Sequence, residues 1–564
     1  MTASDGVRLS VNVTGEKTAP TVVLVHGYPD NSAMWSGVAD RLTGYRVVRY
    51  DVRGAGASEA PPSRSGYRLD QLADDLAAVA DAVSPHRPFH VLAHDWGSIQ
   101  AWHAVTGDRL RGRISSFTSI SGPDLDHVGH WFRQQLRRPT PRRLRNAFAQ
   151  LAHSAYIAFF QLPVIPESSW RLGVMPLLIR RLDPSAGKQD KRDGINGLEL
   201  YRANMFTRIG KPAERGTDVP VQVLVPKGDR FVTGPLQAEV ARWATNLRVR
   251  RISGTHWVPR SDPGLIASAT AEFVDHVEGG AETRALRRAR VNPAPGGRFP
   301  GNLVVVTGAG SGIGRATALA FAEQGADLVL ADVDSGGNAE TARLVRATGR
   351  SAAEYTVDVG KGEQVSGFAD TVRAEHGVPD IVVNNAGIGM AGPFLETGAG
   401  DWERVIDVNL WGVINGCRAF APLLAERGEG GHIVNIASIA AYLPNKVLPA
   451  YSTTKAAVLA LSACLRAELA GKDIGVSAIC PGIVRTSITE TTTFVGTAPD
   501  EQRRRRKQGT RMYAMRGFGP ERVAEDILRA VERNTALAPS TPEAKTALVL
   551  SRLTPGLLRA AAAR

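Results

Sequence analysis

The stretch Phe89-His90-Val91-Leu92-Ala93-His94-Asp95-Trp96-Gly97-Ser98 decides the fold of the first half of the chain. An apolar run typical of a buried β-strand leads into a corner of small residues, and the apolar-faced segment 99–105 follows it. Such a strand-to-helix corner exposes its apex residue, here Asp95, at the carboxyl end of a sheet. A carboxylate placed there can attack a saturated, electrophilic carbon and form an ester that water opens. The same pattern also fits an ordinary turn with a capping Asp, so the surrounding sequence has to decide.

Strand-like and helical segments alternate around this corner. The strand-like runs cover residues 8–14, 21–25, 45–50, 89–93 and 114–120. This alternation predicts an α/β fold with a mostly parallel sheet covered on both faces. Helical spacing rich in Arg, Leu and Pro replaces it over about 123–219, and strand-like runs return at 221–225 and 247–252. We therefore expect an α/β domain over residues 1–278 with an inserted helical lid.

A second α/β pattern occupies the rest of the chain. Residues 279–301 are rich in Arg and then in Pro and Gly, which predicts an interdomain linker. The pattern after it predicts a Rossmann-type, doubly wound domain over residues 302–540, followed by an apolar, partly helical tail at 541–564. A chain of 564 residues is long enough for two hydrophobic cores.

The composition is that of a folded, cytoplasmic protein. Apolar residues make up 43% and charged residues 22%, and no run of about 18 apolar residues could span a bilayer. Residues 1–15 lack the apolar core of a signal peptide. The three cysteines, Cys417, Cys464 and Cys480, lie far apart, which argues against a metal site and a disulfide framework.

The net charge of +13 is partly concentrated in two runs. Six arginines fall within 131–145 without an acidic residue, and Arg503 to Lys507 form a second cluster. Such runs usually form solvated helix faces, and the alternatives are an anionic lipid, peripheral contact with a membrane surface, or a carrier phosphate. No nucleic acid partner is expected, because no nucleic-acid-binding motif accompanies the charge.

Three further features supply what an Asp nucleophile needs. His26-Gly27-Tyr28-Pro29 follows a strand, and the amides of Tyr28 and Trp96 could stabilise an oxyanion. Asp229 and His256 each follow a strand beyond the lid. Asp229 would hold the imidazole, and His256 would activate the water that hydrolyses the ester.

Through the HGxP motif, the Asp elbow and this order of residues, residues 1–278 resemble the α/β-hydrolase epoxide hydrolases. That family places two lid tyrosines over the nucleophile to stabilise the alkoxide, and Tyr156 and Tyr201 are similar to them in their surroundings. The resemblance implies conversion of an epoxide to a vicinal diol through an ester on Asp95. Haloalkane dehalogenases share the Asp-Trp-Gly elbow, with Trp96 then binding halide. A lipid-binding domain without turnover is the second alternative.

The second half carries a dinucleotide-binding pattern. Gly308-Ala309-Gly310-Ser311-Gly312-Ile313-Gly314 follows a strand and opens a helix, so backbone amides can approach a pyrophosphate; the contact residues are Gly308, Ser311, Gly312, Ile313 and Gly314. Asp332 ends the next strand, where its carboxylate can accept from a ribose 2′-hydroxyl and repel a 2′-phosphate. The pattern favours NAD over NADP, with Arg315 as the residue that argues otherwise.

The spacing over about 299–534 resembles the short-chain dehydrogenase/reductase family. The resemblance assigns catalysis to Asn409, Ser438, Tyr451 and Lys455, and further cofactor contacts to Asp358, Val359, Asn385, Tyr451, Lys455 and Thr486. Tyr451 and Lys455 are four residues apart on one helix and share a face, so the ammonium can lower the pKa of the phenol that exchanges the proton. The segment 487–519 would form the substrate loop.

Together these features predict a bifunctional enzyme. It resembles actinobacterial fusions of an epoxide hydrolase with a short-chain dehydrogenase, which implies an epoxidised lipid or other small-molecule epoxide as substrate. The resemblance also implies a homo-oligomer assembled through the dehydrogenase domain. A vicinal diol made by the first site has hydroxyl groups that the second site could oxidise.

Overall fold

The chain folds into two compact units. The computed structural model describes residues 1–137, 139–291, 297–443, 445–556 and 558. The units are Met1–Pro293 and Ala294–Arg564, so the division falls inside the segment expected to be a linker. The first part of that segment contains the helix α13 (Arg284–Arg288), and the amide of Val249 donates to the Ala289 carbonyl at 2.7 Å. Residues up to 291 therefore pack with the first unit.

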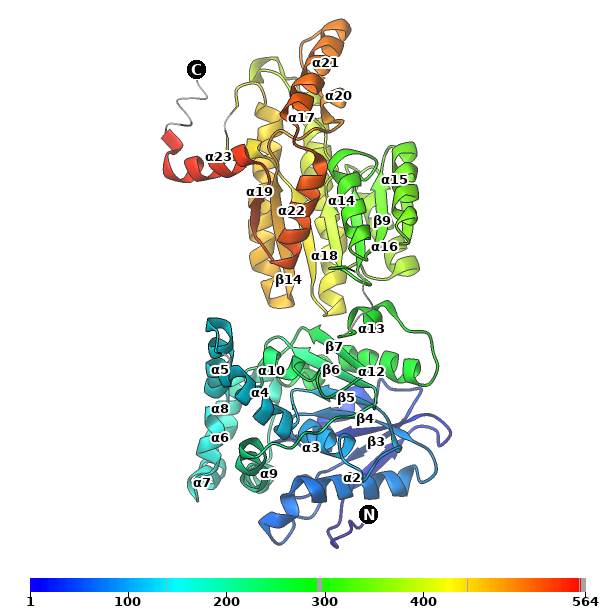
Figure 1. Cartoon of the computed structure of the whole chain (residues 1–564), viewed down its shortest axis with the longest axis vertical. Coiled ribbons are helices and arrows are strands. Elements are labelled where there is room, and N and C mark those ends of the chain that lie inside the picture. The colour runs from blue at the N-terminus through cyan, green and yellow to red at the C-terminus, as the bar shows by residue number, and fades with distance from the viewer. Residues whose placement is uncertain (138, 292–296, 444, 557, 559–564) are drawn as a thin grey trace. The chain divides into compact units, whose positions relative to one another are not determined.

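A seven-stranded sheet forms the centre of the first unit (Figure 1). Its spatial order is β1-β3-β2-β4-β5-β6-β7, and only the β1–β3 pair is antiparallel. The strands are β1 (Val11–Thr14), β2 (Thr21–Val25), β3 (Arg46–Tyr50), β4 (Phe89–His94), β5 (Ile114–Ile120), β6 (Val221–Pro226) and β7 (Leu247–Ile252). This mostly parallel sheet confirms the predicted fold class.

The first predicted strand begins later than expected. Residues 8–10 precede β1, and only an isolated bridge joins Thr2 to Arg8. The amide of Arg8 donates to the Glu59 carboxylate at 3.1 Å, and that of Ser10 donates to the Ser58 hydroxyl at 2.9 Å. Because side chains accept these bonds, the two amides do not extend the ladder with β3.

Helices cover both faces of this sheet. Val23 and Val25 belong to the core that contains α2 (Leu69–Val83) and α3 (Trp96–Val105). Val22 and Leu24 belong to the opposite core, which contains α1 (Ser36–Ala39) and α12 (Pro263–Val277). Both alternating sets are buried, which explains why β2 is a continuous apolar run. Short helices complete the layer: η1 (Ser32–Trp35), η2 (Arg64–Tyr67), α10 (Gly234–Ala238) and α11 (Val258–Ser261).

A helical lid is inserted between β5 and β6. It consists of α4 (Leu125–Arg137), α5 (Pro141–His153), α6 (Ala155–Phe160), α7 (Ile165–Arg171), α8 (Val174–Leu182), η3 (Pro184–Ala186) and α9 (Lys191–Gly210). In Figure 1 these helices occupy one side of the first unit. The helix α9 brings Leu198 and Tyr201 into the same core as β4, which fixes the lid to the sheet.

The second unit contains a parallel sheet of order β10-β9-β8-β11-β13-β14-β16. The strands are β8 (Leu303–Thr307), β9 (Asp327–Asp332), β10 (Ala352–Thr356), β11 (Ile381–Asn384), β13 (Gly431–Ile436), β14 (Ile474–Cys480) and β16 (Leu537–Pro539). The order reverses between β8 and β11, as in a Rossmann fold, and confirms that prediction. A separate small sheet pairs β12 (Met390–Ala391) with β15 (Thr493–Phe494).

Two groups of helices cover this second sheet. One core joins the sheet to α14 (Gly312–Glu323), α15 (Ser335–Ala347) and α22 (Pro520–Glu532). The opposite cores contain α16 (Gly362–His376), α18 (Gly412–Arg427) and α19 (Pro449–Leu469). The remaining elements are η4 (Phe394–Glu396), α17 (Ala399–Ile406), η5 (Asp407–Trp411), η6 (Ile439–Ala441), η7 (Ala470–Lys472), α20 (Ile488–Thr491), α21 (Pro499–Arg516) and α23 (Pro542–Leu553).

Part of the expected tail packs on the second unit. The Tyr442 hydroxyl donates to the Ala544 carbonyl at 2.9 Å, and Glu543 accepts from the Ile483 amide at 3.1 Å. The helix α23 is thereby joined to Tyr442 and to the segment just before residues 487–519, the predicted substrate loop.

Candidate active sites

The corner after β4 has the geometry expected of a nucleophile turn. Asp95 lies at the amino end of α3 with φ 52° and ψ −125°, a conformation that an L-residue rarely adopts. Neighbouring backbone passes so closely that only glycine fits beside it. A Cβ on Gly97 would lie 2.2 Å from the Val25 carbonyl oxygen, and one on Gly122 would lie 2.1 Å from that of Asp95. The glycine spacing in the sequence therefore reflects a steric requirement.

The Asp95 carboxylate is held between the HGxP loop and a histidine. The amide of Tyr28 donates to Asp95 Oδ1 at 2.8 Å, and His256 Nε2 lies 3.5 Å from Asp95 Oδ2. A Cβ on Gly27 would lie 2.5 Å from Asp95 Oδ1, so the loop lies directly against the carboxylate. The Tyr28 amide is thus the donor that the sequence places in the oxyanion site.

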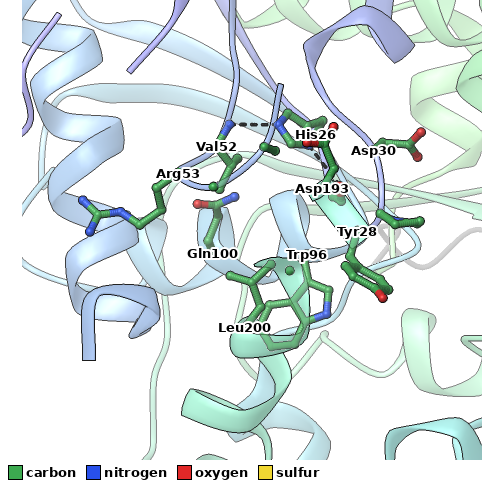
Figure 2. Close-up of a pocket in the computed structure, with 14 residues that line it drawn as sticks. His26, Tyr28, Asp30, Val52, Arg53, Trp96, Gln100, Asp193 and Leu200 are labelled. Carbon is green, nitrogen blue, oxygen red and sulfur yellow. Dashed lines mark hydrogen bonds between the residues drawn. The ribbon is translucent and has the colours of Figure 1, made fainter. Parts of the chain in front are cut away.

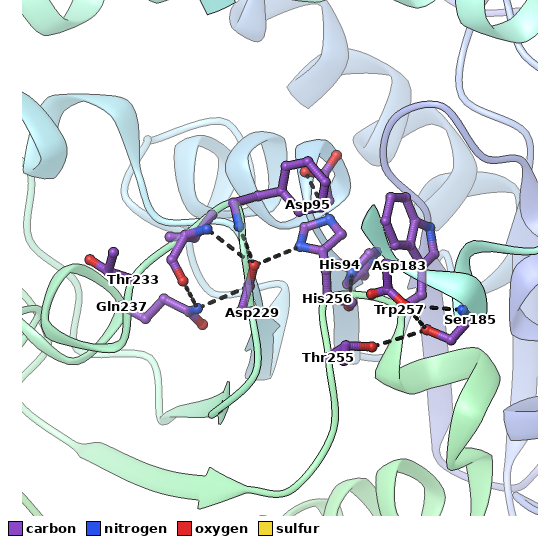
Figure 3. Close-up of polar contacts among 12 residues, drawn as sticks. His94, Asp95, Asp183, Ser185, Asp229, Thr233, Gln237, Thr255, His256 and Trp257 are labelled. Atoms are coloured by element: carbon purple, nitrogen blue, oxygen red, sulfur yellow. Dashed lines mark hydrogen bonds and ion pairs between the residues drawn. The ribbon is translucent and has the colours of Figure 1, made fainter. Parts of the chain in front are cut away.

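The histidine connects Asp95 to a second buried acid (Figure 3). His256 Nδ1 lies 3.2 Å from Asp229 Oδ1. Asp229 also accepts from the amides of Phe231 at 2.8 Å and Val232 at 3.1 Å, which fix its orientation. Three residues that are far apart in the sequence therefore form one line of contacts across the carboxyl ends of the strands.

Charge and burial act in opposite directions on this histidine. Burial alone lowers the pKa of His256, but the Asp229 carboxylate, with a further contribution from Asp95, raises the pKa to about 10. Burial likewise disfavours ionised Asp229, yet His256 and the surrounding donors hold the pKa of Asp229 below its ordinary value. The free site therefore holds an imidazolium between two carboxylates.

A second histidine supports the loop that carries His256. His94, directly before the nucleophile, donates from Nε2 to the His256 carbonyl at 2.8 Å. Burial, together with the nearby His256 charge, lowers the pKa of His94 to about 4, so its ring stays neutral. No motif in the sequence indicates a role for His94, although it lies within the stretch 89–98.

Asp30 is a second residue that the sequence analysis left out. Its carboxylate accepts from the Trp257 indole at 2.6 Å and from the Arg260 guanidinium at 2.5 Å. These contacts tie the HGxP loop to the segment that follows His256. The available signal was an acidic residue directly after His26-Gly27-Tyr28-Pro29.

Two lid tyrosines lie on the nucleophile side. Tyr201 of α9 has its ring centroid 4.8 Å from that of Trp96 and 6.0 Å from that of Tyr156 on α6. Burial, followed by electrostatic contributions that include the Asp95 charge, raises the pKa of both phenols above the ordinary value. Both therefore keep their protons and can donate hydrogen bonds beside Asp95.

A narrow pocket lies beside this group (Figure 2). Tyr28, Trp96 and Leu200 line it, together with the polar side chains of Gln100 and Asp193. The Gln100 side-chain oxygen is buried and has no hydrogen-bond partner among the described residues. The pocket therefore combines apolar walls with an acceptor for a polar group.

In the second unit, the glycine loop forms the turn that a dinucleotide requires. Gly308 has φ +65°, and a Cβ on Gly314 would lie 2.0 Å from the Gly308 carbonyl oxygen. Asn385 Nδ2 donates to the carbonyls of Thr307 and Gly308, both at 3.0 Å, which supports its assigned place. Ser311 precedes α14, whose first turn contains Gly312 and Ile313. A glycine-rich loop at a helix amino end fits a pyrophosphate.

Asp332 stands where an adenosine ribose would be recognised. Its carboxylate accepts from the amides of Gly310 at 2.7 Å and Asp334 at 2.9 Å, so its position relative to the loop is fixed. Arg315 donates to the Thr341 hydroxyl at 3.0 Å and to the Gly337 carbonyl at 3.2 Å. Arg315 also donates to the Gly310 carbonyl, so its guanidinium joins α15 to the loop residue that the Asp332 carboxylate contacts.

The other predicted cofactor residues follow strands of the same sheet. A Cβ on Gly312 would lie 3.2 Å from the Thr486 Cβ, so Thr486 faces the glycine loop. Asp358 follows β10 and accepts from the Gly360 amide at 3.0 Å, and Val359 is buried beside it. These residues lie at the carboxyl side of the strands, as predicted.

The side chains of Lys455 and Asn409 both lie close to Gly387 in the second site. A Cβ on Gly387 would lie 3.1 Å from Asn409 Oδ1 and 3.5 Å from Lys455 Nζ. Asn409 lies in η5, a π-helical turn between α17 and α18, and its amide bonds with the backbone of Ile388. Such turns are frequent at functional sites because they re-aim a side chain.

Tyr451 and Ser438 flank Lys455. The Lys455 ammonium lies 5.8 Å from the centroid of the Tyr451 ring and donates to the Ile436 carbonyl at 2.9 Å. Ser438 caps η6, accepting from the Ala440 amide at 3.2 Å. Burial lowers the pKa of Lys455 to about 8, with Cys480 acting weakly in the opposite direction.

Comparison with known proteins covers both units. A family model described as alpha/beta hydrolase fold matches residues 20–251, and one described as short chain dehydrogenase matches residues 302–494. "Probable oxidoreductase EphD" of Mycobacterium tuberculosis H37Rv is 44% identical over 575 residues, covering 99% of this chain and 97% of that protein. "Putative oxidoreductase SadH" of the same organism is 38% identical over 45% of this chain and 91% of its own length.

A crystal structure of a short chain dehydrogenase/reductase from Burkholderia phymatum in complex with NAD is 34% identical. It covers 46% of this chain and 94% of that protein, with a TM-score of 0.43.

Proposed function

This chain belongs to the family of fused α/β-hydrolase and short-chain dehydrogenase proteins that includes mycobacterial EphD, and we propose that it joins an epoxide hydrolase to an NAD-dependent oxidoreductase. The observation that carries the hydrolase part is the line from Asp95 through His256 to Asp229, with two protonated phenols on its lid side. An aspartate in this place favours attack on alkyl carbon, and the phenols favour an epoxide over a halide.

In the first step, one oxygen of Asp95 bonds to an epoxide carbon while the carbon–oxygen bond of the ring breaks. The released alkoxide takes a proton from Tyr156 or Tyr201, leaving a hydroxyl group on the bound substrate. The resulting phenolate can recover a proton from the His256 imidazolium. This transfer leaves a neutral imidazole, which is the form needed for the second step.

In the second step, water attacks the carboxyl carbon of the Asp95 ester while His256 accepts one of its protons. The bond from that carbon to the substrate oxygen then breaks, and the substrate oxygen takes the other water proton, which frees the diol and restores the Asp95 carboxylate. The amides of Tyr28 and Trp96 would hold the oxyanion until the diol leaves. Ester formation also removes the negative charge of Asp95, and with it one cause of the raised pKa of His256. Asp95, which bonds to the substrate carbon, thus also affects the pKa of His256, the base that activates water to hydrolyse the ester.

The dehydrogenase unit would exchange a hydride between a nicotinamide cofactor and a hydroxyl or carbonyl group. When bound, NAD supplies the hydride acceptor. Asp332 would accept from the ribose hydroxyls, Lys455 would hold the nicotinamide ribose, and Tyr451 would exchange the proton with the substrate oxygen, which Ser438 also bonds. Asp332 supports NAD over NADP because its carboxylate would repel a 2′-phosphate.

Oxygen-18 water tests the hydrolase proposal directly. Repeated turnover of a lipid epoxide such as an epoxidised fatty acid should place label in the peptide that contains Asp95. Direct attack of water on the epoxide would label the diol and leave that peptide unlabelled. Hydrolysis of alkyl halides in preference to epoxides would instead identify a dehalogenase.

The two reactions could form a sequence, because the first would produce a diol and the second would oxidise hydroxyl groups. Purified diol is added with NAD to the full chain, and NADH absorbance is followed. Reduction of NAD would support the sequence. No reduction with the diol of any accepted epoxide would show that the units act on separate substrates.

A further inference from the structure

The helix α8 presents a second apolar face that nothing in the first unit covers. Met175 and Ile179 point into the protein and are buried. The outward face is apolar too, at the spacing i, i+3, i+4 and i+8 that places residues on one side of a helix. Its exposed side chains are Val174 (56%), Leu177 (63%), Leu178 (48%) and Leu182 (40%).

The uncovered apolar surface continues onto the neighbouring turns. Leu172, between α7 and α8, is 79% exposed, and Val164 and Ile165, at the start of α7, are exposed as well. We call these seven residues, Val164, Ile165, Leu172, Val174, Leu177, Leu178 and Leu182, the α7–α8 patch. Twelve of the 24 large apolar residues that are exposed in the described part of the chain lie within the lid, so the patch is a local concentration.

Positive charge accompanies this patch. Arg171, Arg180 and Arg181 are exposed, and none forms an ion pair with another described residue. Glu167 is the single acidic residue within 162–182, and its carboxylate is occupied by Arg202 at 2.7 Å. The surface therefore combines uncovered leucines with exposed guanidinium groups, and its one carboxylate is bound to Arg202.

We propose that the α7–α8 patch binds the surface of an anionic lipid bilayer. A helix with an apolar face and flanking arginines lies in the interface of such a membrane, with its apolar side chains among the acyl chains. No helix in the described ranges is long and apolar enough to cross a membrane.

The charges favour lipid over a second copy of the chain. A two-fold contact through this patch would bring Arg180 and Arg181 of both copies together, because such an interface pairs a surface with itself. The patch provides no acidic residue to neutralise them. Anionic head groups supply that charge from the partner instead, and the acyl region accepts the leucines.

The same helices border the proposed hydrolase site. Trp170 of α7 donates its indole N–H to the Tyr28 hydroxyl at 2.9 Å, and Arg202 of α9 binds Glu167 of α7. Docking of this patch would hold the lid of the first unit at the lipid surface. The membrane contact does not depend on which bond the hydrolase site cleaves, and the two proposals can fail separately.

Vesicle sedimentation of the full chain tests the contact. Vesicles of phosphatidylglycerol are compared with vesicles of phosphatidylcholine at low and high salt. We expect binding to the anionic vesicles that weakens with salt. The Arg180→Gln/Arg181→Gln variant should bind them about 30-fold more weakly, at about fivefold for each basic residue near the surface. The Leu177→Ser/Leu178→Ser variant should lose at least about tenfold through its lost apolar burial.

The matched control is Val549→Ser/Leu550→Ser on α23, where the two side chains are 54% and 40% exposed. This variant should bind as the wild type does, and circular dichroism confirms that all variants are folded. Absence of binding to phosphatidylglycerol, or equal weakening by the control, would overturn the proposal. A shift from oligomer to monomer in Leu177→Ser/Leu178→Ser, with vesicle binding unchanged, would assign the patch to a second copy.

Discussion

The two sites each bury a basic group, and burial has opposite outcomes in them. His256 lies between two carboxylates, which offset burial and raise its pKa to about 10. Lys455 has a backbone carbonyl as its hydrogen-bond acceptor and no carboxylate contributing to its pKa, which burial lowers to about 8. The hydrolase site thus stores a proton, whereas the dehydrogenase site holds an ammonium that gives up its proton readily. Neighbouring charge, more than depth, decides how a buried base behaves.

If the two sites work independently, the variant Asp95→Ala should abolish the activity of the first site only. We expect epoxide hydrolysis to fall about 10⁴-fold or more, since removal of a nucleophile leaves only binding and oxyanion stabilisation. NAD-dependent oxidation should be unchanged. Both rates are measured on the same preparation with separate substrates. Loss of both activities would mean that the units depend on one another.

The reciprocal variant is Tyr451→Phe. Removing the phenol that exchanges the proton should lower the oxidation rate about 10²–10⁴-fold and leave hydrolysis intact. The variant keeps the ring next to Lys455, so NAD binding, followed by fluorescence, should change little. Retention of full oxidation would exclude Tyr451 as the proton-exchanging group.

The lid tyrosines sharpen the description of the first site. Tyr156→Phe/Tyr201→Phe should lower kcat for epoxide opening by about 10²–10³, because removing an oxyanion donor has this effect. Each single variant should lose less, since the other phenol remains next to Asp95. Phe keeps the ring packing against Trp96, and an unchanged thermal midpoint would confirm this. An effect confined to KM would indicate that the tyrosines only bind substrate.

In the second site, Asp332→Ala tests how the cofactor is selected. Loss of a charged acceptor for ribose hydroxyls should decrease kcat/KM for NAD by about 10–100-fold. Activity with NADP should rise or stay level, because the repulsion of its 2′-phosphate is removed. Equal loss with both cofactors would show that Asp332 acts by holding Gly310.

Local sequence signals predicted that Asp95, Asp229 and His256 would lie together, but not their electrostatics. The elbow at Asp95 and the glycine loop at Gly308 have strict backbone requirements that few residue types satisfy. The charge on His256 depends instead on distances to acids more than 25 and 160 residues away in sequence. The contact of Asp30 with Trp257 joins residues 227 positions apart, and no periodicity predicts it.

In the lid, the sequence does not predict which side of a helix is exposed. The helix α8 is apolar on both sides, a pattern typical of a buried helix. Only the arrangement of its neighbours reveals that one side is covered and the other is exposed. Likewise, residues 8–10 alternate as a strand does, but nearby polar side chains bind their amides.

The opposite pKa shifts of His256 and Lys455 predict opposite pH dependence of the two units. His256 binds its proton more tightly in the folded state, so it contributes stability fully below pH 6.5 and loses it as pH rises toward 10. Lys455 is harder to protonate when folded, so its cost is full below pH 8 and disappears as pH approaches 10.5.

Thermal unfolding at pH 7 and pH 9.5 measures the pH dependence of each unit. The wild type is compared with a variant that lacks the buried base of that unit. The stabilising difference between wild type and His256→Gln should shrink at pH 9.5. At pH 7 the second unit of the wild type should be less stable than that of Lys455→Met. This difference should also shrink at pH 9.5, so the wild-type midpoint of the second unit rises relative to the midpoint of the variant. Each kcal/mol should shift a midpoint by about 2–4 °C.

Seven of the nine tryptophans lie in the first unit, so fluorescence reports mainly on it, and NAD identifies the other transition by raising its midpoint. If the two signed differences in midpoint, wild type minus variant, both rose or both fell between pH 7 and pH 9.5, the contrast between the two buried bases would be wrong.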